Sequence, residues 1–244
     1  MENPAQEALR VLEEAERRKV TLRLLGGLAF FLRCPSAKRP DLARTYVDID
    51  TIGRQKDSPR LRTLFTDLGY TARDRFNALQ GYRRLIYDDP GNGRRVDVFL
   101  DVFEMCHTFD FSKRLELDRY TLSLSDLLIT KLQIVEITPK DFKDLLALLI
   151  DHEVEFGDGA PIDARYIAKL CSADWGVYTT LTINLDKLVE QIRVLDTTET
   201  ERTLVTDRIG RLRGAIEAVP KGWGWKARAA VGQKARWYEL PEGI

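Results

Sequence analysis

The chain has 244 residues, of which 44% are hydrophobic, so it can bury a core in one large domain or two small ones. Its 38 Lys and Arg residues balance 38 Asp and Glu residues, which gives a formal net charge of zero. That balance excludes a protein that holds nucleic acid through bulk charge alone, although it leaves room for a local basic surface.

The first half of the chain alternates between helical and strand patterns. Asn3-Pro4 is typical of a helix start, and this helix is expected to run to about Lys19. A hairpin is predicted where two apolar strands flank the turn sequence Asp-Asp-Pro-Gly-Asn-Gly at residues 88–93. The other expected elements, in chain order, are a strand over 20–25, a helix over 28–32, a polar loop over 36–44, a strand over 46–52, a helix over 58–68, the hairpin strands over 82–87 and 94–103, and a strand near 115–122.

The second half of the chain has helical periodicity throughout. Helices are expected over residues 125–136, 139–152, 163–170, 184–195 and 199–218. The chain is therefore predicted to be α+β, with an α+β domain at residues 1–122 and an all-helical domain at residues 123–244. The last domain ends in a basic stretch, 221–237, that holds three tryptophans.

Several classes of protein are disfavoured by what the sequence lacks. Cys34, Cys106 and Cys171 are far apart and form no Cys-x-x-Cys pair, so we expect neither a zinc site nor a disulfide framework. No basic segment followed by an apolar stretch opens the chain, and the longest apolar run, Leu145 to Ile150, is too short for a bilayer. These features favour a cytoplasmic protein without a membrane partner.

The most informative segment combines a glycine turn with two aspartates. In a strand, Asp48 and Asp50 share one face about 7 Å apart, where their carboxylate oxygens can bracket a hard cation that offsets their repulsion. Gly26-Gly27, at a strand-to-helix turn, lets backbone N–H groups approach an anion at the start of a helix. A metal-binding carboxylate pair and a phosphate cradle are the two parts that a nucleoside triphosphate requires.

A third carboxylate is expected from a neighbouring strand. Asp97 and Asp101 share a face of the strand over 94–103 but lie about 13 Å apart, so at most one reaches the metal. Asp97 is the better candidate, because apolar residues flank it on both sides, as in a central strand.

A lysine on an apolar helix face gives a second signal. Lys131 falls in the middle of the apolar arc of the helix over 125–136, where it must snorkel, pair with an anion or face a cleft. The next helix is apolar nearly all round and carries Asp141 and Asp144 near its start, although Asp141 is also placed as the acidic half of a capping box.

These residues, taken in order, carry a resemblance. Leu25-Gly26-Gly27, Asp48-Ile49-Asp50 and the later Asp97 resemble the pattern of the DNA polymerase β-like nucleotidyltransferase superfamily. Many members have a serine whose hydroxyl contacts the triphosphate at the second glycine position. Here Gly27 offers only its backbone.

The sequence motifs around Lys131, Asp141 and Asp144 resemble those of one branch of that superfamily. Leu-Leu-Ile-Thr-Lys-Leu at 127–132, Lys-Asp-Phe-Lys-Asp-Leu at 140–145, and Arg44 ahead of the carboxylates look like the signature of AbiEii-type nucleotidyltransferases. The resemblance covers roughly residues 20–150. It implies that Lys131 and either Asp141 or Asp144 belong to the active site, and that Arg44 with Gly26 and Gly27 binds the nucleotide.

The resemblance also implies a fold and a reaction. The fold would be a nucleotidyltransferase-type mixed β-sheet flanked by helices, followed by the helical domain. The reaction would move a nucleoside monophosphate from an NTP to a hydroxyl, with Mg²⁺ or Mn²⁺ held by Asp48, Asp50 and Asp97. Asp97 would also accept the proton of the attacking hydroxyl, and Lys131 would neutralise phosphate charge.

The acceptor stays open at this point. Relatives of this branch include toxins that add nucleotides to tRNA ends, enzymes that modify proteins and enzymes that modify antibiotics, so RNA, a protein or a small molecule would fit. A toxin–antitoxin system, with a cognate antitoxin as partner, is one implication. The basic tryptophan-rich tail either binds RNA through charge and stacking or packs on the helical domain. The competing class is a nucleotide-binding module that does not turn over.

Overall fold

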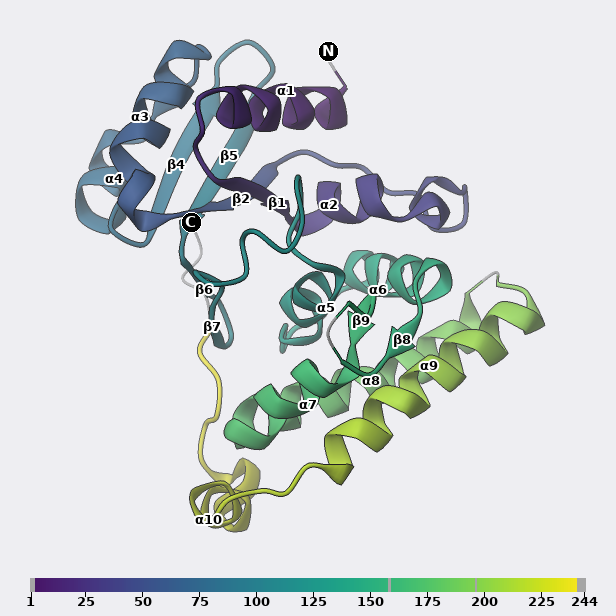
Figure 1. Cartoon of the computed structure of the whole chain (residues 1–244). Helices are drawn as coiled ribbons and strands as arrows, with labels where there is room; N and C mark the ends of the chain where they lie inside the picture. The colour runs from purple at the N-terminus through teal and green to yellow at the C-terminus, as the bar shows by residue number, and fades with distance from the viewer. Residues whose placement is uncertain (1–2, 158, 196, 241–244) are drawn as a thin grey trace. The chain divides into compact units, whose positions relative to one another are not determined.

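The computed structural model describes residues 3–157, 159–195 and 197–240, and these fall into two compact units (Figure 1). Unit 1 comprises Met1–Arg33, Thr45–Glu104 and Thr108–Ser123, and unit 2 comprises Cys34–Arg44, Met105–His107 and Leu124–Ile244. The chain thus passes between the units several times. The expected boundary at residues 122 and 123 stays a prediction about domains that fold independently.

Unit 1 is built on a mixed β-sheet. Its strands follow the order β1–β2–β5–β4–β3, with β6 attached to β5 and β7 to β6. All pairs are antiparallel except β2 and β5, which run parallel. The strands are β1 (Leu22–Leu25), β2 (Ile49–Gly53), β3 (Thr71–Ala72), β4 (Arg84–Asp89), β5 (Arg94–Leu100), β6 (Val102–Glu104) and β7 (Thr108–Asp110).

Short helices connect and cover these strands. The first begins as predicted, because the Asn3 side chain accepts a hydrogen bond from the backbone N–H of Ala5 and Pro4 occupies the first turn. Figure 1 shows it beside β1, on which it packs. The helices of unit 1 are α1 (Pro4–Arg17), α2 (Gly26–Arg33), the 3-10 turn η2 (Gln55–Asp57), α3 (Ser58–Asp67) and α4 (Asp74–Gln80).

The core of unit 1 joins a helix to the sheet. The rings of Phe65 on α3 and Tyr87 on β4 stack with their centroids 4.5 Å apart, and both side chains are buried. The predicted hairpin is present as β4 and β5, with Asp89 opposite Arg94 across the turn. Its turn fixes the register of every residue farther along these two strands.

One expected strand was wrong. Residues 115–122 form turns, and only Thr121 makes an isolated bridge, to Leu24 of β1. The last residues of the segment do bond to β1, since Leu24 donates to the carbonyl of Tyr120 and Leu122 donates to the carbonyl of Leu24. The residues before them form no strand, and Leu115 and Leu122 are apolar because they are buried.

Unit 2 is helical, as predicted, apart from a small parallel pair of strands. Most expected helices are found, and α8 begins nine residues earlier than expected, because Asp174 caps it through hydrogen bonds from Gly176 and Val177. The elements are the 3-10 turn η1 (Pro35–Lys38), α5 (Leu124–Leu132), α6 (Pro139–Asp151), β8 (Val154–Glu155), β9 (Ile162–Asp163), α7 (Ala164–Ala173), α8 (Trp175–Val194), α9 (Glu199–Ala218), α10 (Trp223–Val231) and η3 (Gly232–Lys234).

The helices of unit 2 enclose a leucine-rich core. Helix α7 packs against α9 and α8, and α5 packs against α6 and α8 (Figure 1). Leu128, Leu145, Leu181 and Leu212 are all fully buried between them. Within the described part of the chain, every helix is too short or too polar to cross a bilayer.

Candidate active site

The glycine turn lies where β1 ends and α2 begins. Gly26 has φ +64°, a left-handed conformation that side chains other than glycine rarely adopt. A Cβ atom at this position would lie 2.1 Å from Oδ2 of Asp50 and 2.9 Å from its Cβ. The turn therefore passes directly over the Asp50 carboxylate, and only glycine allows this approach. Gly27 follows it as the second residue of α2.

Strand pairing brings the predicted carboxylates together. Leu25 of β1 is opposite Asp50 of β2, and Asp50 is in turn the partner of Asp97 on the parallel strand β5. Paired residues on adjacent strands point to the same face, so Asp50 and Asp97 are neighbours across about 4.8 Å of sheet. Asp48 precedes β2 by one residue and has its side chain 41% exposed.

Two arginines, which the sequence analysis missed, share this face. Arg84 of β4 donates from Nε to Oδ1 of Asp97 at 2.9 Å, and its Nη2 lies 2.8 Å from the same oxygen. Arg95 of β5 has its Nε 3.0 Å from Oδ2 of Asp97 and its Nη2 3.9 Å from Oδ2 of Asp48. The signal was present in the sequence, because the hairpin register and a period of two place Arg84, Arg95 and Asp97 on one face.

One oxygen of the site lacks a hydrogen bond. Oδ2 of Asp97 is buried and accepts no hydrogen bond from any described residue, since the nearby Nε of Arg95 is out of line for one. A buried carboxylate oxygen that accepts no hydrogen bond is suited to coordinate a cation.

The side chains of the site offer the kind of donor atom that Mg²⁺ binds. Asp48, Asp50 and Asp97 offer carboxylate oxygens only, the ligands that this ion takes. Among the described residues, no three acidic, cysteine or histidine side chains converge closely enough to hold an ion as they stand. Asp97 is paired with two guanidinium groups, which an incoming cation would have to displace in part.

The residues predicted in the helical half form a separate buried cluster within unit 2. Nζ of Lys131 donates to Oδ1 of Asp141 at 2.7 Å and lies 2.9 Å from Oδ2 of Asp144. Arg44 donates from Nε and Nη2 to the two oxygens of Asp144, at 2.9 and 2.8 Å. The lysine on the apolar arc thus has anionic partners, and two cations face two carboxylates.

In this cluster, the attraction between opposite charges affects the pKa values more than the loss of water that burial causes. Burial alone would lower the pKa of Lys131, but Asp144 and Asp141 more than offset it, so the pKa lies above the ordinary lysine value. Burial would raise the pKa of Asp141, and the charge of Lys131 with hydrogen bonds from Lys131 and Thr138 instead holds it below the ordinary value. The same Asp141 completes the predicted capping box of α6 with Thr138.

The cluster joins three segments of unit 2. Lys131 comes from α5, Asp141 and Asp144 come from the first turns of α6, and Arg44 ends the Cys34–Arg44 segment. The roles of these four residues in nucleotide chemistry stay predictions, since the partners described here are all within their own unit.

Comparison with known proteins gives structural neighbours but no sequence family. No protein-family model and no curated protein matches the sequence. Solved structures of nucleotidyltransferases are similar to parts of the chain. The lincomycin-bound lincosamide antibiotic adenylyltransferase LnuA is 17% identical over 59% of this chain and 94% of its own, with a TM-score of 0.43.

Two further structures are similar to the same degree. The antibiotic-resistance factor ANT(2'')-Ia is 12% identical over 59% of this chain and 81% of its own, with a TM-score of 0.40. An antigenic nucleotidyltransferase-like protein from Paracoccidioides brasiliensis is 13% identical over 73% of this chain and 91% of its own, with a TM-score of 0.41. At these identities and scores, the function of the chain has to be argued from its own residues.

Proposed function

We propose that this chain is a nucleotidyltransferase, which moves a nucleoside monophosphate from an NTP to a hydroxyl acceptor. One observation supports this most: the register Leu25–Asp50–Asp97, which brings a left-handed glycine turn and two carboxylates to one point of the sheet. A turn that presents backbone N–H groups beside acidic oxygen donors combines an anion site with a cation site. Those are the two requirements of a metal-bound triphosphate.

The phosphates would be held by the start of α2. Gly26 and Gly27 open this helix directly after β1, so that unobscured backbone N–H groups and the positive end of the helix face an anion. The space that a side chain of Gly26 would take is filled by the Asp50 carboxylate, so a phosphate would meet the turn through its backbone N–H groups.

Asp48, Asp50 and Asp97 would hold the divalent ion. When bound, Mg²⁺ or Mn²⁺ supplies charge neutralisation of the phosphates and of the entering and leaving oxygens. Arg84 and Arg95 are both paired with Asp97, and an ion held by Asp97 would leave their guanidinium groups available to phosphate oxygens.

The bond changes follow from this arrangement. The acceptor hydroxyl oxygen forms a bond to the α-phosphorus, while the bond from that phosphorus to the oxygen bridging to the β-phosphate breaks and pyrophosphate leaves. Asp97 takes the hydroxyl proton. Lys131, with Asp141 or Asp144, would act on phosphate charge as the motif resemblance implies, and an AbiEii-type toxin with an antitoxin partner rests on that resemblance alone.

The test is transfer of a labelled nucleotide. The full chain is incubated with Mg²⁺ and each NTP, labelled either at the α- or at the γ-phosphate, together with total RNA, total protein or a panel of hydroxylated small molecules. Label from the α position is expected in one acceptor class, and label from the γ position in none. Asp48→Ala is expected to abolish transfer. Equal transfer by Asp48→Ala and the wild type, or transfer of the γ label, would contradict the proposed reaction.

A further inference from the structure

The C-terminal segment of unit 2 carries a concentrated positive charge. Between residues 219 and 240 there are five basic residues and one acidic residue, although the whole chain is neutral. The members are Lys221, Lys226, Arg228, Lys234 and Arg236 against Glu239. A polyanion would therefore be drawn to this segment by local charge.

Some of these cations are already engaged and others are not. Arg228 donates to the backbone carbonyls of Gly232 and Ala235, which holds the end of the tail against α10. Lys226 and Lys234 form no ion pair with any residue from 3 to 240 whose placement the structure gives. Two lysines thus remain for a partner outside the chain.

An aromatic ring stands beside one of these lysines. Trp223, the first residue of α10, is 89% exposed, more than any other large apolar residue that the structure describes. Nζ of Lys226 lies 5.8 Å from the centre of its ring. An exposed indole next to an unpaired ammonium group offers a stacking surface and a phosphate contact to the same ligand.

A separate cavity of about 280 Å³ lies between the start of α8 and the face of α10 that is opposite Trp223 and Lys226. It is lined by Asp174, Trp175, Trp225, Arg228 and Trp237, among others. The indole nitrogens of Trp225 and Trp237 donate to the carbonyl of Cys171 and to Oγ1 of Thr180, at 2.9 and 3.1 Å. These hydrogen bonds hold α10 and the residues after it against α7 and α8, and Cζ of Arg228 lies 4.5 Å from the centre of the Trp175 ring, so the tail is docked and Trp223 is left on the outer face.

We propose that Trp223 and Lys226, on the exposed face of α10, bind single-stranded nucleic acid by base stacking and phosphate contact. Stacking on an exposed indole ring accepts any base, and the charge excess of the segment matches a polyanion. A membrane surface fits less well, because the nine-residue α10 exposes only Trp223 and Val231 as large apolar residues, too little for an interfacial helix. The inference is independent of the nucleotidyl transfer proposed above, because no residue assigned to that reaction lies in the segment from 219 to 240.

The experiment measures binding of a fluorescent oligouridine of about 12 nucleotides to the full chain by fluorescence anisotropy. Trp223→Ala is expected to raise the Kd about tenfold, and Trp223→Phe to restore most of the affinity. Lys226→Gln is expected to lower the slope of log Kd against log salt by about 0.7, the share of one phosphate contact. The duplex of the same length is expected to bind less tightly, since its bases are not free to stack.

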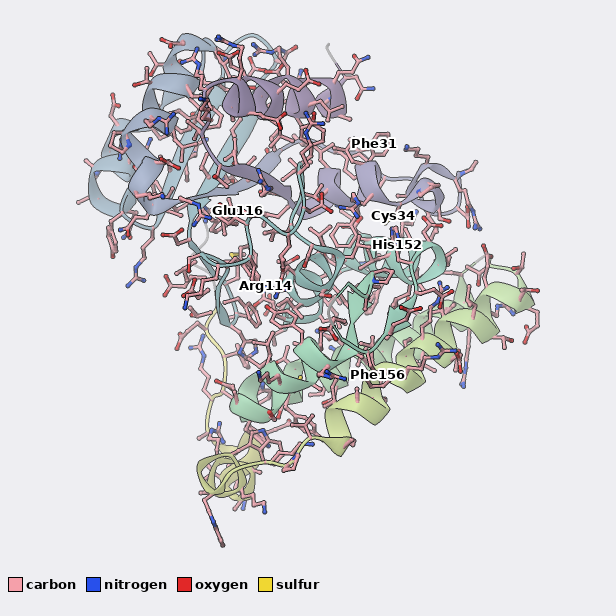
Figure 2. The ribbon with its side chains drawn as sticks, viewed as in Figure 1. Phe31, Cys34, Arg114, Glu116, His152 and Phe156 are labelled. Carbon is pink, nitrogen blue, oxygen red and sulfur yellow. The ribbon has the colours of Figure 1, made fainter. Side chains whose placement is uncertain are left out.

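Matched variants distinguish binding at this surface from nonspecific binding elsewhere on the chain. Phe156→Ala removes another aromatic ring of unit 2, which is 60% exposed and lies away from α10 (Figure 2). Lys187→Gln removes a lysine of α8. Both variants are expected to keep the wild-type Kd. Asp50→Asn is also expected to bind normally. Absence of binding by the wild type, or unchanged binding by Trp223→Ala, would overturn the inference, and so would binding of phosphatidylserine vesicles without the oligonucleotide.

Discussion

At the residue scale, the candidate site depends on one glycine. Gly26 combines a left-handed φ with a backbone that passes over the Asp50 carboxylate, so two separate physical costs oppose any side chain there. A left-handed residue with a Cβ is strained, and the added atom must also push Asp50 out of its register with Asp97. The site and the fold of unit 1 are therefore tied at this residue.

Gly26→Ala is expected to lower the free energy of unfolding by about 2–5 kcal/mol, as the sum of backbone strain and overpacking. Gly69→Ala is the matched control, because Gly69 also has a positive φ, +88°, but has open space around it. It should cost only the strain, about 1–2 kcal/mol. Urea unfolding followed by far-UV circular dichroism measures both. Equal losses in the two variants would show that the contact with Asp50 is unimportant.

At the element scale, local signals predicted more than long-range ones. The Thr138-Pro139 start of α6, its capping box with Asp141 and the β4–β5 hairpin were predictable, because caps and turns depend on neighbours in sequence. The mistaken strand at 115–122 shows the limit, since burial and strand pairing both favour alternating apolar residues.

The site itself was predictable only in part. The positions of Asp50 and Asp97 followed from strand periodicity, and the structure pairs them. The pairing of Arg84 and Arg95 with Asp97 needed the register of the hairpin in addition. Arg44 precedes the carboxylates in sequence but bonds to Asp144 a hundred residues later, a contact that no local pattern indicates.

The ion pair between Lys131 of α5 and Asp141 of α6 should make the stability of unit 2 fall at acid pH. The pKa of Asp141 is lowered in the folded state, so its stabilisation is present above the unfolded value, near 4, and is lost as pH falls through the folded pKa. The pKa of Lys131 is raised, so its share persists at neutral pH and is lost only as pH rises through that value.

Tryptophan fluorescence is the suitable measurement, because all four tryptophans belong to unit 2. Below about pH 4, the free energy of unfolding should fall less steeply for Asp141→Asn than for the wild type. Lys131→Met should lose about 3 kcal/mol at neutral pH, because it leaves the buried Asp141 carboxylate without its cation, whereas Asp144 keeps Arg44. Identical acid slopes in Asp141→Asn and the wild type would rule out this source of stability.

At the scale of the whole molecule, the two units are interleaved along the chain. Unit 2 includes Cys34–Arg44, which lies between strands of unit 1 in sequence. This segment supplies Arg44 to Asp144, and Ser36 donates from its backbone N–H and hydroxyl to Asp151 at 2.9 and 2.6 Å. A helical domain that begins at residue 123 would lack all of these contacts.

A fragment of residues 124–240 is therefore expected to unfold at lower urea than unit 2 does in the full chain, by tryptophan fluorescence. The loss should be at least about 2 kcal/mol, since hydrogen bonds to charged groups contribute about 1.5–3 kcal/mol each. The full chain with Ser36→Ala and Arg44→Ala should show a similar loss. A fragment as stable as the full chain would instead support the boundary at residues 122 and 123.

We expect Asp50 and Asp97 to hold a divalent ion together with a triphosphate on the Gly26 turn. Binding of Mn²⁺ in the presence of a non-hydrolysable NTP analogue, measured by electron paramagnetic resonance, tests it most directly. The wild type should bind the ion, and Asp50→Asn and Asp97→Asn should each weaken binding at least about tenfold. Asp101→Asn, directly after the last residue of β5 and four residues from Asp97, should bind like the wild type. Normal Mn²⁺ binding by Asp50→Asn and Asp97→Asn would contradict the account.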